Sequence, residues 1–171
     1  TPNTTFKIQQ GTVKIKGDQP FNQTNGVIDL QGGTVKTTSL FSWVQNNDSS
    51  AINMRGGDLT QSGNMHWNAK SDIHLDDGVF TVIGNITFGE KAGELKFARD
   101  SNGTFVSNNT QSELQTLIDN ADITKIGGTF VFTEHGGTTI LSVAATPETS
   151  ELSPTALISI GNLAILLNPS K

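Results

Sequence analysis

The sequence predicts an all-β protein, a parallel β-solenoid of about five short rungs with three strands per rung, capped by a short helix and a β-hairpin. Three observations support this prediction: a near-repeated block occurs four times, apolar residues alternate with polar ones inside each block, and glycine recurs at one fixed place in every block. A repeat of roughly 20 to 25 residues is typical of solenoids, in which each turn of the coil, a rung, stacks on the next.

Four aromatic residues, Phe21, Trp43, Trp67 and Phe88, align the blocks, because the same offsets before each of them give the same type of residue. At three of these offsets the residue is apolar in every block, and at the fourth it is always glycine. These sets are, in order, Phe6, Ile28, Ile52 and Ile73; Ile8, Leu30, Met54 and Leu75; Gly11, Gly33, Gly57 and Gly78; and Val13, Val35, Leu59 and Phe80. We therefore expect the four aromatic residues to form an inward-facing ladder. The alternative is a β-sandwich or meander with ordinary alternation.

Apolar pairs at a spacing of two indicate short strands, and the glycines between them indicate corners, because glycine adopts positive φ without a steric penalty. A second corner is expected at Gly17, Ser39, Gly63 and Gly84. A fifth, degenerate rung is expected to begin at Leu95 and Phe97. It resumes at Gly103 and Phe105 after an insertion, 99–102.

The solenoid is expected to occupy residues 1–110, the cap residues 111–143, and a spacer with an apolar segment residues 144–171. In the cap, the run from Ser112 to Gln115 predicts a capping box that opens a helix ending near Asn120. Strands at 128–133 and 138–143, joined by a turn at 134–137, predict a β-hairpin.

The apolar stretch 156–167 is too short to span a bilayer as a helix. We expect it to pack on its own solenoid or to dock as a strand on a neighbouring subunit. The possible assembly residues are Leu157, Ile158, Ile160, Leu163, Ile165 and Leu166.

Composition argues against several classes of protein. The net charge is −5 and the 11 lysines and arginines are scattered, which disfavours a nucleic-acid or anionic-lipid partner. The chain has no cysteine, and its glycine-rich turns lack the Gly-Lys-Ser/Thr of a phosphate loop. We therefore expect no cofactor. The chain opens without a starting Met or a signal peptide, which fits either a mature form whose export signal has been removed or a trimmed chain.

Solenoids also host polysaccharide lyases and hydrolases, and the best candidate cluster for such chemistry is His74, Asp76, Asp77 and Glu90. His74 and Asp76 alternate with apolar neighbours, so they are expected to face solvent, as is His66; His135 falls in the hairpin turn. We expect no enzymatic activity and no metal site.

The outward positions beside the third apolar ladder form a flat, hydroxyl-rich face that suits carbohydrate or ice. Its members are Thr12, Lys14, Lys16, Thr34, Lys36, Thr38, Asp58, Thr60, Ser62, Val79, Thr81 and Ile83. The lysines and the aspartate interrupt a threonine grid, which argues against ice. Outward aromatics for stacking on sugars are scarce, because tyrosine is absent and both tryptophans belong to the inward ladder.

The phrases Gly32–Val35 and Gly56–Leu59, the run 112–122 and the segments 126–132 and 137–143 together resemble bacterial surface proteins of the PEP-CTERM type, with autotransporter-passenger-like β-helix repeats. The run from Thr146 to Ser150 before an apolar stretch is similar to that family's sorting signal, although Thr149 replaces its second proline and a basic cluster is missing. The resemblance implies an exported surface or matrix protein and no catalytic residues.

The leading interpretation is therefore an extracellular or cell-surface structural protein, a subunit of a surface layer, matrix or filament. It would assemble with itself, as a homo-oligomer or filament, through the solenoid ends or terminal strands. The alternative is a carbohydrate-binding or adhesive surface module with a glycan partner.

Overall fold

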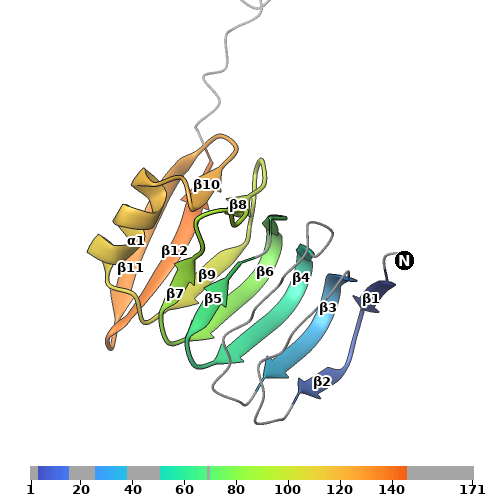
Figure 1. Cartoon of the computed structure of the whole chain (residues 1–171). Coiled ribbons are helices and arrows are strands. Elements are labelled where there is room, and N and C mark those ends of the chain that lie inside the picture. Colours follow the sequence, from blue (N-terminus) through green and yellow to red (C-terminus); the bar gives the residue numbers. More distant parts are fainter. Residues whose placement is uncertain (1–3, 16–25, 38–50, 69, 146–171) are drawn as a thin grey trace, which may run out of the picture.

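The computed structural model of the chain describes residues 4–15, 26–37, 51–68 and 70–145, and the elements below lie in these ranges (Figure 1). The elements in chain order are β1 (Thr4–Ile8), β2 (Thr12–Ile15), β3 (Gly26–Thr37), β4 (Ala51–Ser62), β5 (Met65–Trp67), β6 (Ile73–Ile83), β7 (Ile86–Phe88), β8 (Leu95–Phe97), β9 (Thr104–Ser107), α1 (Gln111–Asp119), β10 (Ile123–Lys125), β11 (Thr129–His135) and β12 (Thr138–Ala144).

The predicted fold class is confirmed: parallel strands stack into a β-solenoid of about 4 turns with one short helix. The main sheet runs in the order β1-β3-β4-β6-β9-β12-β11, with β2 on β3 and β8 on β6 (Figure 1). The long strands β3, β4 and β6 bend at the glycine corner and supply two sides of a rung, while β5 and β7 pair in parallel as a third side. β8 and β9 form the degenerate last rung, as predicted.

The strand register places the predicted repeat positions directly over one another. The first ladder joins Phe6, Ile28, Ile52, Ile73 and Leu95; the second joins Ile8, Leu30, Met54, Leu75 and Phe97; the third joins Val13, Val35, Leu59, Phe80 and Phe105. The members from the second rung onward are buried and form the core. This stacking explains the repeat, since one rung cannot bury its apolar side chains alone.

The recurrent corner glycine is required by close packing between rungs. Gly33, Gly57 and Gly78 have φ of 76°, 75° and 89°. A Cβ at Gly57 would lie 2.5 Å from the carbonyl oxygen of Gly33 in the preceding rung. Any other residue would therefore strain its own backbone and collide with the rung before it.

The helical cap is confirmed, but the predicted capping box is wrong. Thr110, not Ser112, is the N-cap: its Oγ1 accepts a hydrogen bond from the Glu113 amide at 3.3 Å, and the Glu113 carboxylate accepts one from the Thr110 amide at 2.8 Å. Ser112 lies inside the first turn. In a capping box, two residues three positions apart each accept a hydrogen bond from the other's backbone amide, and here these residues are Thr110 and Glu113. The helix therefore starts earlier than predicted.

The predicted hairpin is formed by β11 and β12, with a tighter turn than expected. Gly136 and Gly137, with φ of 60° and 79°, form the turn, so the strands extend to His135 and from Thr138. Two residues with positive φ match the twist of a hairpin. The hairpin continues the main sheet, because β12 pairs antiparallel with β9, while the short strand β10 extends β8 in parallel.

Candidate functional site

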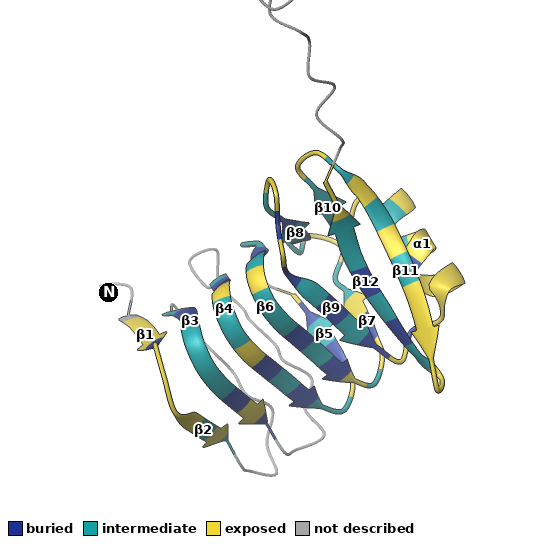
Figure 2. Cartoon of the chain, turned by 180° about the vertical axis from the view of Figure 1, so that it is seen from behind, coloured by how far each residue is buried: buried dark blue, intermediate teal, exposed yellow. Residues whose placement is uncertain are grey.

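The exposure of the first ladder changes abruptly at the β1 end of the stack. Phe6 is 47% exposed, whereas Ile28 directly above it is 2% exposed and Ile52 is fully buried. Figure 2 shows the same contrast between the exposed strands β1 and β2 and the buried bands of β4 and β6. Within the first rung, Ile8 is only 4% exposed and Val13 is half-buried, so Phe6 is the ladder residue of this rung that is exposed.

The outer edges of β1 and β2 have no partner strand among the described residues. β1 pairs with β3 along Thr4–Ile8, and β2 pairs with β3 along Thr12–Ile15. Strands at the edge of a sheet present backbone N–H and C=O groups that accept a further strand. We call these two strands and their outward side the open end.

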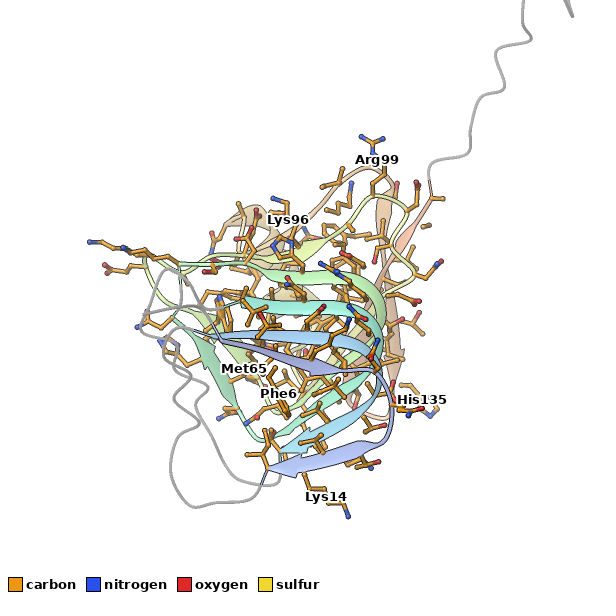
Figure 3. All side chains as sticks on the ribbon, turned by 90° about the vertical axis from the view of Figure 1, so that its right-hand side faces the viewer. Phe6, Lys14, Met65, Lys96, Arg99 and His135 are labelled. Carbon is orange, nitrogen blue, oxygen red and sulfur yellow. The ribbon has the colours of Figure 1, made fainter. Side chains whose placement is uncertain are left out.

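An open hollow with a mixed polar and apolar lining lies at the open end. It measures about 450 Å³ and is lined by Phe6, Lys7, Ile8, Gln9, Gln10 and Val13. Figure 3 views this end of the coil, with Phe6 inside its outline and Lys14 pointing away from it. In the interior of the stack, the corresponding space is filled by the side chains of the preceding rung.

The corner glycine of the first rung confirms that this space is free of other described atoms. A Cβ at Gly33 would lie 2.7 Å from the Gly11 carbonyl oxygen, but a Cβ at Gly11 would meet nothing within 4 Å. Gly11 nevertheless keeps the positive φ, 85°, of the other corners. The first rung thus has the backbone shape of an interior rung, without a neighbour on its outer side among the described residues.

A polar network borders the hollow at the first corner. The Gln9 amide donates to the Gln31 Oε1 at 3.3 Å, Gln31 donates to the Asp29 carboxylate at 2.8 Å, and Arg55 Nε lies 3.7 Å from Asp29 Oδ1. These contacts join three successive rungs. They hold the first corner in register with the second, so the open end is a defined edge.

The sheet has a second outer strand at its other end. β11 pairs with β12 on one side and with no described strand on the other. Its exposed residues include Val131, at 40%, and Glu134, while Lys7 and Lys14 are exposed at the open end. The two edges of one sheet therefore carry opposite charges.

The predicted aromatic ladder is described in part. Trp67 is buried, Phe88 packs partly buried against the core, and the two are register partners in β5 and β7. The indole Nε1 of Trp67 donates to the Ser71 carbonyl at 2.9 Å. Phe21 and Trp43 lie outside the described residues, as do all six predicted assembly residues, Leu157, Ile158, Ile160, Leu163, Ile165 and Leu166.

The candidate acid/base cluster is spread over two elements. His74, Asp76 and Asp77 belong to β6, and Glu90 follows β7 in an exposed turn. Asp77 Oδ1 accepts a hydrogen bond from the Gly78 amide at 2.7 Å. Among the described residues, no three His, Asp or Glu side chains gather in a group able to hold a metal ion.

The other two histidines lie on the surface of the sheets. His66 alternates with the buried Met65 and Trp67, and its Nδ1 lies 3.0 Å from the Thr87 hydroxyl. His135 is exposed at the end of β11, beside the turn.

The hydroxyl-rich face is present as rows across the sheet. One row joins Lys14, Lys36, Thr60 and Thr81, and another joins Thr12, Thr34, Asp58 and Val79. Lys16 and Thr38 lie outside the described residues. The rows place Lys14 and Lys36 side by side toward the open end, whereas Asp58 brings a negative charge to β4.

A second, smaller hollow lies beside the insertion 99–102. It measures about 170 Å³, and its lining residues are Asp100, Ser101, Asn102, Gly127, Gly128, Val143 and Ala145. Ser101 is buried, and its hydroxyl donates to the Leu75 carbonyl at 2.8 Å, which ties the insertion to the stack. The lining thus combines polar residues of the insertion with the apolar Val143 and Ala145.

Sequence reasoning missed a polar ladder inside the solenoid. Thr37, Gln61 and Ser107 are buried at the inward position that Val82 occupies in β6. The Thr37 hydroxyl lies beside the Gln61 Oε1 and 3.1 Å from the Thr60 carbonyl oxygen. The signal was available for two of them, since Thr37 and Gln61 share one offset, six residues before Trp43 and Trp67.

No protein-family model matches the sequence, and comparisons with curated proteins and with solved structures also give no match. Among the described residues, no helix has the length and apolar character needed to cross a membrane.

Proposed function

We propose that the protein is a structural protein of the cell exterior, a subunit of a surface layer, matrix or filament that assembles with itself through the edges of its solenoid. The observation that carries the proposal is the open end, where Phe6, Ile8 and Val13 line a hollow beside two strand edges that have no partner in the described part of the chain. Edge strands of this kind promote association unless they are covered.

Two different edges on one sheet favour assembly into chains. If the open end of one copy meets the β11 edge of the next, the contact joins unlike surfaces. Such heterologous contacts repeat without closing when the rotation between copies does not close a ring. The opposite charges of Lys14 and Glu134 at the two edges add a long-range attraction.

The location outside the cell belongs to the same proposal. It is supported by the abundance of glycine, the low share of charged residues, 16%, and the resemblance to bacterial surface proteins described above. A carbohydrate-binding or adhesive role is the alternative, favoured by the hollow beside Asp100 and Asn102.

The proposal is tested by a carboxylate placed in the hollow. We expect the wild-type protein to form regular polymers in negative-stain microscopy and high-mass species in light scattering, and Phe6→Asp to remain monomeric, because a buried charge opposes docking. Thr5→Asp, one residue away on the outward side of β1, is the matched control and is expected to assemble normally.

Circular dichroism melting establishes that both variants are folded. A wild-type protein that stays monomeric at every concentration, and that binds immobilised glycans, would overturn the structural role in favour of the adhesive one. Equal assembly by Phe6→Asp and wild type would exclude the open end as the contact.

A further inference from the structure

The structure defines a rung pattern that can be compared with the segment after β12. In each interior rung, a first inward residue is followed by a second one two positions later. The corner glycine lies three positions after the second inward residue. A third and a fourth inward residue lie two and four positions after the glycine. In β4 these five residues are Ile52, Met54, Gly57, Leu59 and Gln61, and in β6 they are Ile73, Leu75, Gly78, Phe80 and Val82.

The segment 156–165 has the same pattern. Its sequence, Ala-Leu-Ile-Ser-Ile-Gly-Asn-Leu-Ala-Ile, places apolar residues at the four inward positions and glycine at the corner. The matching residues are Ala156, Ile158, Gly161, Leu163 and Ile165. Pro154 and Pro169 flank the segment, and proline is found at the borders of strands because it donates no backbone hydrogen bond.

We propose that residues 156–165 of one copy dock on the open end of a second copy as the rung that precedes β1 and β2. This inference rests on the proposed function and names the partner surface. The open end supplies edge strands, and the incoming segment supplies four apolar side chains for the hollow.

The fit is specific at two positions of the first rung. Phe6 is the bulkiest residue of its ladder and would lie over Ala156, the smallest inward residue of the segment, so their volumes complement one another. Gly161 would lie against Gly11, where the space that a Cβ would enter is free of described atoms. In the interior rungs, that space is bounded by the carbonyl of the preceding corner glycine.

Chain length favours a second copy over the segment's own open end. Five strand spacings of about 4.8 Å, roughly 24 Å in all, separate β12 from β1 in one copy. The ten residues 146–155 reach at most about 36 Å when fully extended. Docking within one copy would stretch this spacer along the whole stack to about two thirds of its full reach or more, at an entropic cost, whereas a neighbour stacked beyond the hairpin is reached directly.

Docking of this kind makes the sheet continuous between copies. The segment would lie between the β11 edge of its own molecule and the β1 and β2 edges of the next, and would pair with backbone groups on both sides. Each copy then donates one rung and accepts one, which produces a filament.

The test uses full-length variants at alternating positions of the segment. Ile158→Asp and Leu163→Asp place a charge at inward positions and are expected to weaken assembly at least about 100-fold in dissociation constant. Ala164→Asp, at the outward position next to Leu163, is the matched control and is expected to assemble within about threefold of wild type.

A mixing experiment tests the pairing directly. Phe6→Asp keeps an intact segment but a blocked open end, and Ile158→Asp keeps an intact open end but a blocked segment. Each is expected to be monomeric alone, and a 1:1 mixture is expected to form a heterodimer with one functional junction, measured by light scattering.

The outcomes separate this inference from the proposed function. If Phe6→Asp is monomeric while Ile158→Asp assembles like wild type, the segment is not the partner and the structural role stands. An equal loss of assembly in Leu163→Asp and Ala164→Asp would show apolar association without a rung and also overturn the inference. A monomeric wild type whose residues 156–165 are protected from hydrogen exchange would overturn both proposals.

Discussion

At the α1 end of the solenoid, a helix, a short strand and a hairpin follow the last rung, whereas at the β1 end no described element lies beyond the first rung. Leu114, Ile123 and Leu141 are buried in the cap, and they extend the core past Leu95, Phe97 and Phe105. Phe6, in the first rung, is half exposed. The first apolar ladder is thus covered at the cap and accessible at Phe6, whereas Ile8, two residues further along β1, is buried.

The difference shows what a repeat can and cannot do. Each rung is a template for another rung of the same shape, so a stack continues until a sequence without the repeat replaces it. Thr110 and Glu113 stop the coil by starting a helix, and Gly136–Gly137 turn the chain back into an antiparallel hairpin. At the β1 end the repeat is intact up to the edge, which is why this edge is suited to a further rung.

Truncation of an aromatic residue in an interior rung and in the first rung is expected to give the largest difference in unfolding free energy between two variants. Phe80→Ala removes a fully buried ring that packs on Phe105, with ring centroids 5.4 Å apart, and is expected to cost about 3–5 kcal/mol of unfolding free energy. Phe6→Ala is expected to cost about 1 kcal/mol in the monomer, because its ring is already half exposed. Urea unfolding at low protein concentration measures both, and equal losses would contradict an open first rung.

Substitution of corner glycines is expected to have the next largest effect. Gly57→Ala and Gly11→Ala share the strain of a positive φ, which costs about 1–2 kcal/mol. Gly57→Ala adds a collision with the backbone of Gly33, so we expect its total cost to reach about 3 kcal/mol or more. The difference between the two variants, measured by urea unfolding, isolates the contact between rungs. Indistinguishable variants would mean that stacked rungs are not in tight backbone contact.

The solenoid itself was predictable because its information is periodic. The offsets from Trp67 and Phe88 align the ladders, and the register of β4 on β6 follows that alignment. A single rung would have been ambiguous, since alternation over a few residues also fits a sandwich. Repetition at fixed offsets removed that ambiguity.

The cap was predictable in kind but not in its contacts. β10 has three residues, Ile123–Lys125, which is too short for a recognisable alternation, and its place beside β8 is set by the packing of α1. The pairing of β12 with β9 joins residues more than thirty positions apart in a direction opposite to all the solenoid pairs. Such long-range choices depend on packing that local sequence does not encode.

The open end as a site was not visible in the sequence. Phe6 and Val13 have the same pattern as their counterparts in the interior rungs, and no residue near them signals exposure. Their accessibility comes from the missing neighbour on their outer side among the described residues, which is a property of the stack and not of the rung.

Removal of a charge at the capped end is expected to give the smallest change in stability. Asp122 lies between α1 and β10, where its amide donates to the Leu117 carbonyl at 2.8 Å and its carbonyl accepts from the Leu95 amide at 2.9 Å. Burial raises the pKa of its carboxyl above the usual 3.8, because desolvation disfavours the charged form. The folded protein therefore holds this proton more tightly than the unfolded chain does. At pH 7 the carboxylate is charged in both states and its burial opposes folding.

Asp122→Asn is thus expected to raise the melting temperature slightly at pH 7. The gain is expected to shrink as the pH falls through the folded pKa and to vanish below 3.8, where the wild-type group is protonated in both states. Lys7→Gln, at the exposed open end, is the matched control and is expected to leave the melting temperature unchanged at both pH values. A rise in the melting temperature of Asp122→Asn that persists at pH 3 would mean that the introduced amide makes a new contact. A rise in the melting temperature of Lys7→Gln would mean that the open end is less solvated than its exposure indicates.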